Sequence, residues 1–268
     1  MQNEVDFLEL LEIKRHELYR DMPWRRDTRG YYVLVSELML QQTQVERVIP
    51  KFEQFISVFP DFASLAAAPL ADVLVLWSGL GYNRRAKFLH EAAKQVVAQH
   101  QGVLPDEEKS LVDLPGVGIN TAGALQAYVY NKPVIFIETN IRTVLIYHFF
   151  DGEIEVQDSL LRDTLAQLID REHPREFYWA MMDYGSWLKR NGVRNNQASR
   201  HYRKQSPLVG SVREIRGAII RELTTGVLTE QVLRSRIDPG DGRYEQAFKQ
   251  LIAEGLIVQT DKRIGLTH

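Results

Sequence analysis

The chain has 268 residues, of which 44% are apolar and 25% are charged, and its formal charges sum to −2. This composition is typical of a folded protein with one large or two modest domains, and it argues against wholesale disorder. The sequence contains no cysteine, which excludes disulfides, thiolate nucleophiles, cysteine zinc sites and cysteine-bound iron–sulfur clusters. It also has neither an apolar run of about 18 residues nor a signal-peptide pattern. We therefore expect a cytoplasmic protein, nucleoid-associated if bacterial, with no membrane partner.

Most of the first 190 residues carry apolar side chains at helical spacing. The spacing predicts helices over residues 7–18, 32–39, 45–56, 70–77, 84–97, 106–113, 120–130, 157–169 and 175–188. Residues 134–137 (Val-Ile-Phe-Ile) are β-like, but the run is too short to predict a strand. The sequence therefore predicts a helical body.

A different pattern follows this helical body. Residues 191–210 are polar and basic, and we interpret them as a linker. Beyond them the spacing predicts helices over residues 212–223, 229–236 and 244–254, then a hairpin of two short strands over residues 256–259 and 263–266. Three helices and a terminal hairpin suggest a winged-helix-like module. The predicted domains are thus 1–190, a linker over 191–210, and 211–268.

The small net charge conceals an uneven distribution. From Asp151 to Glu176, eight acidic residues face three arginines, a balance of −5. From Ser186 to Arg216, eight basic residues face one glutamate, a balance of +7. Such a basic stretch is expected of a contact with a phosphate backbone, although a solvated basic loop has the same composition.

Residues 114–123 form the strongest local motif, Leu-Pro-Gly-Val-Gly-Ile-Asn-Thr-Ala-Gly. Two glycines two residues apart, between two predicted helices, indicate a tight helical hairpin. Its main-chain N–H groups and the N-terminus of the following helix could bind a phosphate oxygen. A lone Gly-x-Gly is more often a turn without a ligand, but the ten-residue string is much more specific.

This string resembles the hairpin of the helix-hairpin-helix DNA glycosylase superfamily. Three other segments resemble the mismatch-specific adenine glycosylases of the MutY type: residues 23–25 (Pro-Trp-Arg), 36–45 (Ser-Glu-Leu-Met-Leu-Gln-Gln-Thr-Gln-Val) and 76–82 (Leu-Trp-Ser-Gly-Leu-Gly-Tyr). The resemblance covers roughly residues 20–188. It implies an all-α fold with two helical subdomains and the active site between them. It also implies a monomer whose partner is double-stranded DNA containing a mismatch or lesion.

The resemblance assigns roles in base flipping and in catalysis. An enzyme acting on a base must extrude it from the stack and fill the hole. Gln42 and Tyr82 match the positions that intercalate, with Gln41 beside them. Glu37 matches the acid that protonates the leaving purine and later activates water. Its apolar neighbours suit a carboxyl group whose pKa is raised by desolvation.

The second carboxylate departs from the family pattern. Residues 136–142 match the segment in which the family carries an aspartate followed two residues later by asparagine. Here the residues are Glu138 and Asn140, so the carboxylate is one methylene longer. Glu138 could replace the aspartate as stabiliser of the oxocarbenium-like sugar, could work through water, or could mark a weakened enzyme.

Five residues match positions around the base pocket: Trp24, Arg25, Asn120, Asn140 and Trp179. Members that also cut the DNA strand carry a Schiff-base lysine at position 120, and asparagine cannot form one. The resemblance therefore implies base removal without lyase activity. Trp179 stands where adenine-specific members usually carry Gln or Glu. It could stack on a flipped base or could be a core tryptophan.

The resemblance also defines the expected DNA-backbone contacts. The residues expected there belong to the hairpin or to the basic stretch: Gly116, Val117, Gly118, Asn120, Thr121, Arg194, Arg200, Arg203 and Lys204. The family's cluster would begin with a cysteine where Lys189 stands. We therefore expect no cofactor, although the hairpin could hold a monovalent cation. The C-terminal module does not resemble the family's 8-oxoguanine-reading domain, and its arginines could contact DNA or only support packing.

These observations together predict a monofunctional DNA glycosylase of base excision repair. Its substrate would be adenine mispaired with 8-oxoguanine or guanine. Two alternatives stay open. The first is a thymine or uracil glycosylase acting on G:T or G:U mismatches, which Trp179 and Glu138 motivate. The second is a lesion-DNA-binding protein without catalysis.

Overall fold

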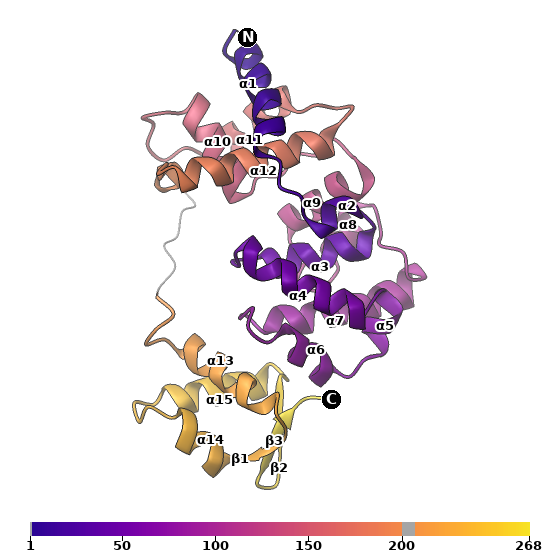
Figure 1. Cartoon of the computed structure of the whole chain (residues 1–268), viewed down its shortest axis with the longest axis vertical. Helices are drawn as coiled ribbons and strands as arrows, with labels where there is room; N and C mark the ends of the chain where they lie inside the picture. Colours follow the sequence, from indigo (N-terminus) through magenta and orange to yellow (C-terminus); the bar gives the residue numbers. More distant parts are fainter. Residues whose placement is uncertain (1, 200–206) are drawn as a thin grey trace. The chain divides into compact units, whose positions relative to one another are not determined.

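The structure is a computed structural model that describes residues 2–199 and 207–268. It is mainly helical, as predicted, with a small antiparallel sheet near the C-terminus (Figure 1). The chain divides into two compact units, which are described one at a time. No helix in the described ranges is long and apolar enough to cross a membrane.

The first unit takes its residues from Met1–Val33, Asp106–Val112 and Val117–Lys204. Its elements are α1 (Gln2–Leu18), α2 (Pro23–Arg26), α8 (Glu108–Val112), α9 (Ile119–Tyr130), α10 (Thr139–Phe149), α11 (Asp158–Leu168), α12 (Pro174–Arg190) and the 3-10 turn η1 (Asn195–Ala198). Helix α12 is central, because α1, α9 and α10 all pack against it. Helix α11 and η1 pack against α10.

Two glycines allow close packing inside this unit. A Cβ added to Gly185 on α12 would overlap the main-chain oxygen of Asn140 and lie 2.7 Å from its carbonyl carbon. A Cβ added to Gly123 on α9 would lie 2.7 Å from Cβ of Phe136. The first neighbour is backbone and cannot rotate away, so the α10–α12 contact depends on glycine at position 185.

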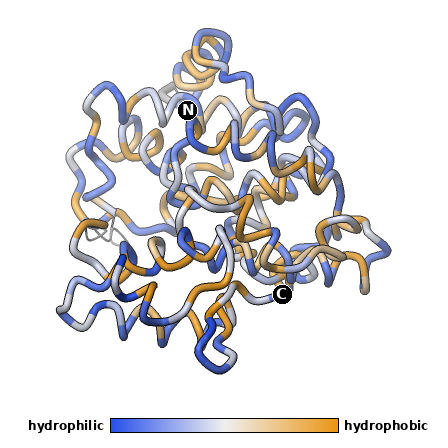
Figure 2. The backbone as a smooth tube through the Cα atoms, turned by 60° about the horizontal axis from the view of Figure 1, so that its bottom comes forward, coloured by the Kyte–Doolittle hydropathy of each residue, from blue (hydrophilic) through white to orange (hydrophobic). Residues whose placement is uncertain are grey.

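The second unit takes its residues from Leu34–Pro105, Asp113–Gly116 and Gln205–His268. Its elements before the hairpin are most of α3 (Gly30–Leu40), then α4 (Val45–Val58), α5 (Phe62–Ala67), α6 (Leu70–Trp77) and α7 (Arg84–His100). Helix α7 packs against α5 and α6, and α6 also packs against α4. Large apolar side chains such as Phe52, Phe55 and Trp77 are fully buried there. Hydrophobic and hydrophilic segments alternate along the backbone in Figure 2, as expected of helices with one buried face.

The C-terminal module (residues 211–268) completes the second unit. Its elements are α13 (Val212–Leu223), β1 (Leu228–Thr229), α14 (Glu230–Ile237), α15 (Arg243–Ala253), β2 (Ile257–Thr260) and β3 (Arg263–Leu266). The antiparallel sheet has the strand order β1-β3-β2, with Leu228 opposite Ile264 and Ile257 opposite Leu266. Helices and hairpin follow the order expected of a winged-helix-like module.

Most predicted helices agree with the structure to within a few residues, and residues 134–137 form no strand. The sequence pattern did not predict α2 and α5, which are too short for an amphipathic pattern, the longer helix α10 (Thr139–Phe149), or the two-residue strand β1. The predicted domain boundaries at residues 190 and 210 stay predictions.

We expect Gly185→Ala to lower the free energy of unfolding by about 2 kcal/mol or more, because the added methyl group meets backbone. Gly217→Ala is the matched control. Gly217 lies on α13 with no atom within 4 Å of an added Cβ. That substitution should stabilise the protein by roughly 0.5–1 kcal/mol through helix propensity. Urea denaturation of both variants measures the difference, and equal stability of Gly185→Ala and the wild type would contradict the packing argument.

Candidate functional site

Glu37 lies on α3 between fully buried neighbours. Val35, Ser36, Leu38 and Met39 are each 0% exposed, whereas Glu37 itself is half-buried. The sequence-based expectation of apolar flanks around this carboxyl group is therefore confirmed.

Two of the predicted intercalating residues share an unusual backbone conformation. Gln42, just after α3, has φ of +56°, and Tyr82, just before α7, has φ of +48°. Residues other than glycine rarely adopt this left-handed conformation, and it persists only where the surroundings enforce it. Both side chains are exposed, Tyr82 by 38%. Strained, exposed and polar residues at loop tips are typical of a binding surface.

A buried arginine bonds to the main chain immediately before each of these two residues. The guanidinium of Arg85, on α7, donates hydrogen bonds to the carbonyl oxygens of Leu38, Met39 and Gln41 at 2.6, 2.9 and 2.6 Å. On the other side it donates to the carbonyl oxygen of Gly81 at 3.2 Å. Burial lowers the pKa of Arg85 to about 10, which still leaves it charged at neutral pH. One guanidinium therefore joins the C-terminal end of α3 to the loop that carries Tyr82.

The predicted hairpin is present between α8 and α9. Gly116 has φ of +82°, and an added Cβ would lie 2.9 Å from Cβ of Phe88, so only glycine fits. Gln41 donates a long hydrogen bond of 3.5 Å to the carbonyl oxygen of Gly116. Gly118 is the N-cap of α9 and is exposed, whereas the side chain of Val117 is buried. The first N–H groups of α9 have no acceptor within their own helix, so this terminus suits an anion.

Glu138 is the N-cap of α10 and is half-buried. Burial raises the pKa of Glu138 to about 7, and the positive charge of Lys189 opposes this shift. Burial lowers the pKa of Lys189, with further lowering by Arg20 and Arg194, whereas Glu138 opposes this shift. The second predicted carboxylate is thus a desolvated acid beside a desolvated base, a combination that is frequent at functional sites.

Asn120 and Asn140, two residues predicted around the base pocket, both belong to the first unit, as does Glu138. Oδ1 of Asn120 accepts a long hydrogen bond of 3.4 Å from the N–H of Ile137, the residue before Glu138. Nη2 of Arg162 lies 3.5 Å from the same oxygen. Nδ2 of Asn140 contacts Sδ of Met182 at 3.9 Å, and its Oδ1 is buried without a hydrogen-bond partner among the described residues. A buried carbonyl oxygen without a donor is costly, so it marks a place for a ligand or water.

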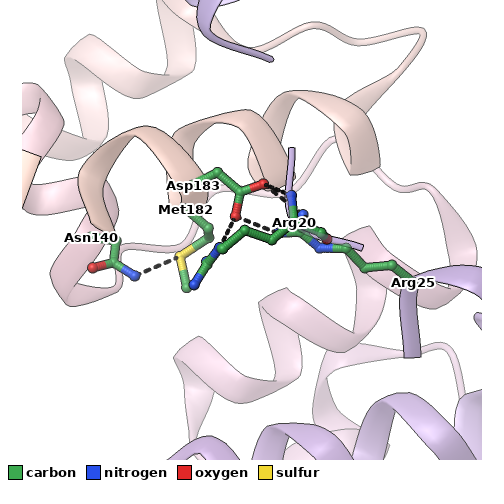
Figure 3. Close-up of polar contacts among 5 residues, drawn as sticks. All are labelled: Arg20, Arg25, Asn140, Met182 and Asp183. Atoms are coloured by element: carbon green, nitrogen blue, oxygen red, sulfur yellow. Dashed lines mark hydrogen bonds and ion pairs between the residues drawn. The ribbon is translucent and has the colours of Figure 1, made fainter. Parts of the chain in front are cut away.

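Arg25 and Trp179 are brought together. Arg25 is already engaged with Asp183, however (Figure 3). Its Nη1 and Nη2 donate to the buried carboxylate of Asp183 at 2.6 and 3.0 Å. Arg20 donates to the same carboxylate from Nε at 2.6 Å. The guanidinium of Arg25 lies 5.2 Å from the ring centroid of Trp179. The ion pair between Arg25 and Asp183 fastens to α12 the segment that carries Trp24, whose side chain is buried. The pocket roles of all three residues stay predictions.

The ring of Trp179 also stacks on Tyr128, with centroids 6.4 Å apart and planes at 30°. Both readings of Trp179 from the sequence are compatible with this contact, because the residue is half-buried. Thr121 lies half-buried in the first turn of α9. Its position next to the hairpin is the one that the sequence predicted.

Only part of the basic stretch lies within the described residues. Arg194 is exposed and donates from Nη1 to the carbonyl oxygen of Lys189 at 2.6 Å, which caps the end of α12. Asn195 donates to the carbonyl oxygen of Thr143 at 2.9 Å, so the start of the stretch is fastened to α10. Arg200, Arg203 and Lys204 lie outside the described residues, and their predicted backbone contacts stay predictions.

The sequence analysis missed three residues that organise the site. Arg85 lies on the apolar stripe of α7 with Leu89 and Val96, and a charged residue on such a stripe was the available signal. Asp183 lies likewise on the buried face of α12. Lys189 stands where the family pattern has a cysteine. Its electrostatic interaction with Glu138 could not be predicted, because the two residues are distant in the sequence.

The chain was compared with known protein families. The HhH-GPD superfamily, described as base excision DNA repair proteins, matches residues 35–169, about half of the chain. The chain belongs to the HhH-GPD superfamily. Within the superfamily match lie Glu37, Tyr82, the hairpin, Glu138 and Asn140. The predicted family is confirmed.

Curated relatives of this HhH-GPD protein carry the name adenine DNA glycosylase. One from Mycobacterium tuberculosis is 32% identical over 92% of this chain and 89% of its own length, so the match reaches into the C-terminal module. One from Buchnera aphidicola is 34% identical over 70% of this chain, which spans about half (54%) of that relative. One from Rattus norvegicus is 37% identical over 62% of this chain and 35% of its own length.

Solved structures agree on the fold. A thermostable thymine-DNA glycosylase has a TM-score of 0.62 and 24% identity over 69% of this chain and 87% of its own. A trapped endonuclease III–DNA covalent intermediate has a TM-score of 0.59 and 17% identity over 77% of this chain and 90% of its own. At these identities the likeness establishes the HhH-GPD fold alone.

We expect Arg85→Met to lower the free energy of unfolding by roughly 2 kcal/mol or more, because it leaves several buried carbonyl oxygens without a donor. The control is Arg84→Met, which removes the same charge from the adjacent, exposed position. That change should alter stability by less than about 0.5 kcal/mol. Thermal denaturation measures both, and a similar effect of the two substitutions would contradict the role assigned to Arg85.

Glu138 should make stability depend on pH. Its pKa is raised by folding to about 7, so its contribution to stability is present below the unfolded pKa near 4.5 and is lost as pH rises through 7. Glu138→Gln, which cannot titrate, should therefore be more stable than the wild type at pH 8, by on the order of 1 kcal/mol, and not at pH 4.5. Urea denaturation at both pH values measures this. Glu153→Gln, at an exposed position, is the control, and a pH-independent gain in Glu138→Gln would contradict the assignment.

Proposed function

We propose that this HhH-GPD protein is a monofunctional DNA N-glycosylase that removes adenine mispaired with 8-oxoguanine or guanine. One observation carries the proposal: a relative named adenine DNA glycosylase is 32% identical over 92% of this chain and 89% of its own length. The substrate of that relative is thereby proposed for this chain. The geometry around Glu37, Glu138 and the hairpin supports the chemistry.

Base extrusion is assigned to the loops joined by Arg85. The unstacking of a base costs a few kcal/mol, and an inserted side chain must replace the lost stacking. Gln42 and Tyr82 are exposed and held in left-handed conformations, so their side chains are presented with little loss of entropy on binding. The N-terminus of α9 at Gly118 is assigned to a backbone phosphate. The duplex is thus the proposed partner.

Bond cleavage is assigned to the two carboxyl groups. Glu37 lies among fully buried neighbours, and we assign it as the general acid toward the leaving adenine. Glu138 in its anionic form would stabilise the positive charge that develops on the sugar. Lys189 favours that anionic form. Asn120 cannot form a Schiff base, so we propose hydrolysis without strand cleavage.

An iron–sulfur cluster does not fit this chain. Cysteine thiolates hold such clusters, and the sequence has no cysteine. Where the cluster segment would begin, the charge of Lys189 interacts with that of Glu138, and the main-chain oxygen of Lys189 accepts a hydrogen bond from Arg194. We propose that the basic stretch beginning here binds the phosphate backbone through charge, with no cofactor.

The alternatives have weaker support. The thymine-DNA glycosylase with a related structure is 24% identical, so it shares the fold with this chain and supports no substrate. A binding protein without catalysis would not require two half-buried carboxyl groups, one of which has a pKa raised by burial. Adenine release is therefore the function that the observations support best.

The proposal predicts that the wild-type protein releases adenine from A:8-oxoguanine and A:G duplexes under single-turnover conditions. Glu37→Gln should be slower by about 100-fold or more, because general acid catalysis contributes that much, while its DNA affinity should stay similar. Glu46→Gln, at an exposed position on α4, should retain the wild-type rate. The DNA strand that has lost its adenine should be cut at the abasic site only after alkali treatment.

Three results would count against this function. The wild type could release no adenine, Glu37→Gln could retain full activity, or G:T and G:U duplexes could be cleaved while adenine-containing duplexes are not. The last result would favour the thymine or uracil alternative.

A further inference from the structure

Two consecutive arginines at the start of α7 follow Tyr82 closely, and they differ in their contacts. Arg85 is buried, and its guanidinium donates to main-chain oxygens on both sides. Arg84 is exposed, and its guanidinium carbon lies 5.0 Å from the centroid of the Phe88 ring, one turn further along α7. The first turn of α7 contains no acidic residue. Within the described residues, Arg84 thus has an aromatic contact but no ion pair.

The side chain of Phe88 also packs against the hairpin. A Cβ added to Gly116 would lie 2.9 Å from Cβ and 3.3 Å from Cδ2 of Phe88. Both residues belong to the second unit, as do Tyr82 and Arg84. The guanidinium of Arg84 therefore lies near the hairpin, because it rests on the ring that contacts Gly116. The Tyr82 loop and the hairpin, two segments assigned to DNA contact, thus both adjoin this one positive charge.

Two other arginines beside the Tyr82 loop are already engaged in hydrogen bonds. Arg47, on α4, donates from Nη2 to a main-chain oxygen of this loop. Arg213, on α13, donates to the hydroxyl oxygen of Tyr82 and to the main-chain oxygen of Pro207. The contact of Arg84 with an aromatic ring uses no hydrogen bond. Its five N–H donors therefore have no acceptor among the described residues.

We propose that Arg84 binds a backbone phosphate of the duplex, between the positions contacted by Tyr82 and by the hairpin. The inference rests on the proposed function, which assigns both neighbouring segments to DNA. A guanidinium matches the geometry of a phosphate group and can bind it through two parallel hydrogen bonds. Arg84 rests on a ring that packs against the hairpin, and the hairpin is assigned to the backbone. Arg84 therefore meets the duplex at the depth of the phosphates and not of the base edges.

A phosphate contact has a characteristic dependence on salt. A protein cation that neutralises a phosphate releases a counterion, and each contact adds about −0.9 to the slope of log K against log salt concentration. Removing Arg84 should therefore make the slope less steep by about 0.9. Counting counterion release alone, the affinity should fall about eightfold at about 0.1 M salt and about threefold at about 0.3 M salt. A contact with a base would instead discriminate between sequences.

The decisive experiment measures the affinity of the full chain for two duplexes by fluorescence anisotropy at several salt concentrations. One duplex carries guanine opposite an adenine with an uncleavable 2′-fluoro sugar, and the other has thymine at that position and is otherwise identical. Arg84→Met should weaken binding to both duplexes by the same factor and make both slopes less steep. Arg84→Lys, which keeps the charge, should retain the wild-type slope. Thermal denaturation of Arg84→Met should match the wild type, which separates lost binding from unfolding.

The control is Lys94→Met, which removes one positive charge from an exposed position on the same helix. Lys94 lies ten residues beyond Arg84, about 15 Å along the helix axis, so this variant should keep the wild-type slope. An unchanged slope in Arg84→Met, or an equal change in Lys94→Met, would overturn the proposal. So would a loss of affinity confined to the mismatched duplex, because that result would indicate a contact with a base.

Binding and cleavage separate this inference from the proposed function. The salt dependence of binding needs no catalysis, so it tests Arg84 even if the wild type releases no adenine. Adenine release with a slope that does not depend on Arg84 would overturn only the inference. A slope that depends on Arg84, without adenine release, would overturn only the proposed activity.

Discussion

The hydrogen bonds of the Arg85 guanidinium are the interactions on which the Gln42 and Tyr82 loops of the second unit depend. A buried positive charge is costly unless polar groups replace its hydration, and main-chain oxygens at the end of α3 and in the Tyr82 loop do so here. Those oxygens have no N–H partner within a helix, because they lie in the last turn of α3, just after it, or in a loop. One side chain therefore satisfies several carbonyl groups next to Gln42 and Tyr82, which both have left-handed conformations.

In the first unit, the buried charged group is the carboxylate of Asp183. Here the buried charge is negative, and Arg20 and Arg25 neutralise it from one short segment. Nearby, Glu138 has no comparable pair of arginines, and its raised pKa is the consequence. The contrast follows from hydrogen bonding: Asp183 accepts several charged donors, whereas Glu138 is opposed only by the more remote charge of Lys189. The carboxylate of Asp183 is thus held in ion pairs, whereas Glu138 stays half-buried with a raised pKa.

Structural features that depend on residues adjacent in sequence could be predicted, whereas features that depend on distant segments could not. Periodicity identified the long helices, and the string around Gly116 and Gly118 identified the hairpin, because both signals are local. The burial around Glu37 followed from its apolar flanks. The partners of Arg85 are main-chain atoms that every residue has, so no sequence pattern marks them. The pKa of Glu138 likewise depends on segments distant along the chain.

The ion pairs of Asp183 also have a consequence for biosynthesis. Arg20 and Arg25 precede their common partner by 163 and 158 residues. The N-terminal segment leaves the ribosome long before α12 exists, while α4 to α7, which pack locally, are already complete. Helices α4 to α7 can therefore form their contacts before α12 has been made. Arg20 and Arg25 reach their common partner only when α12 is present.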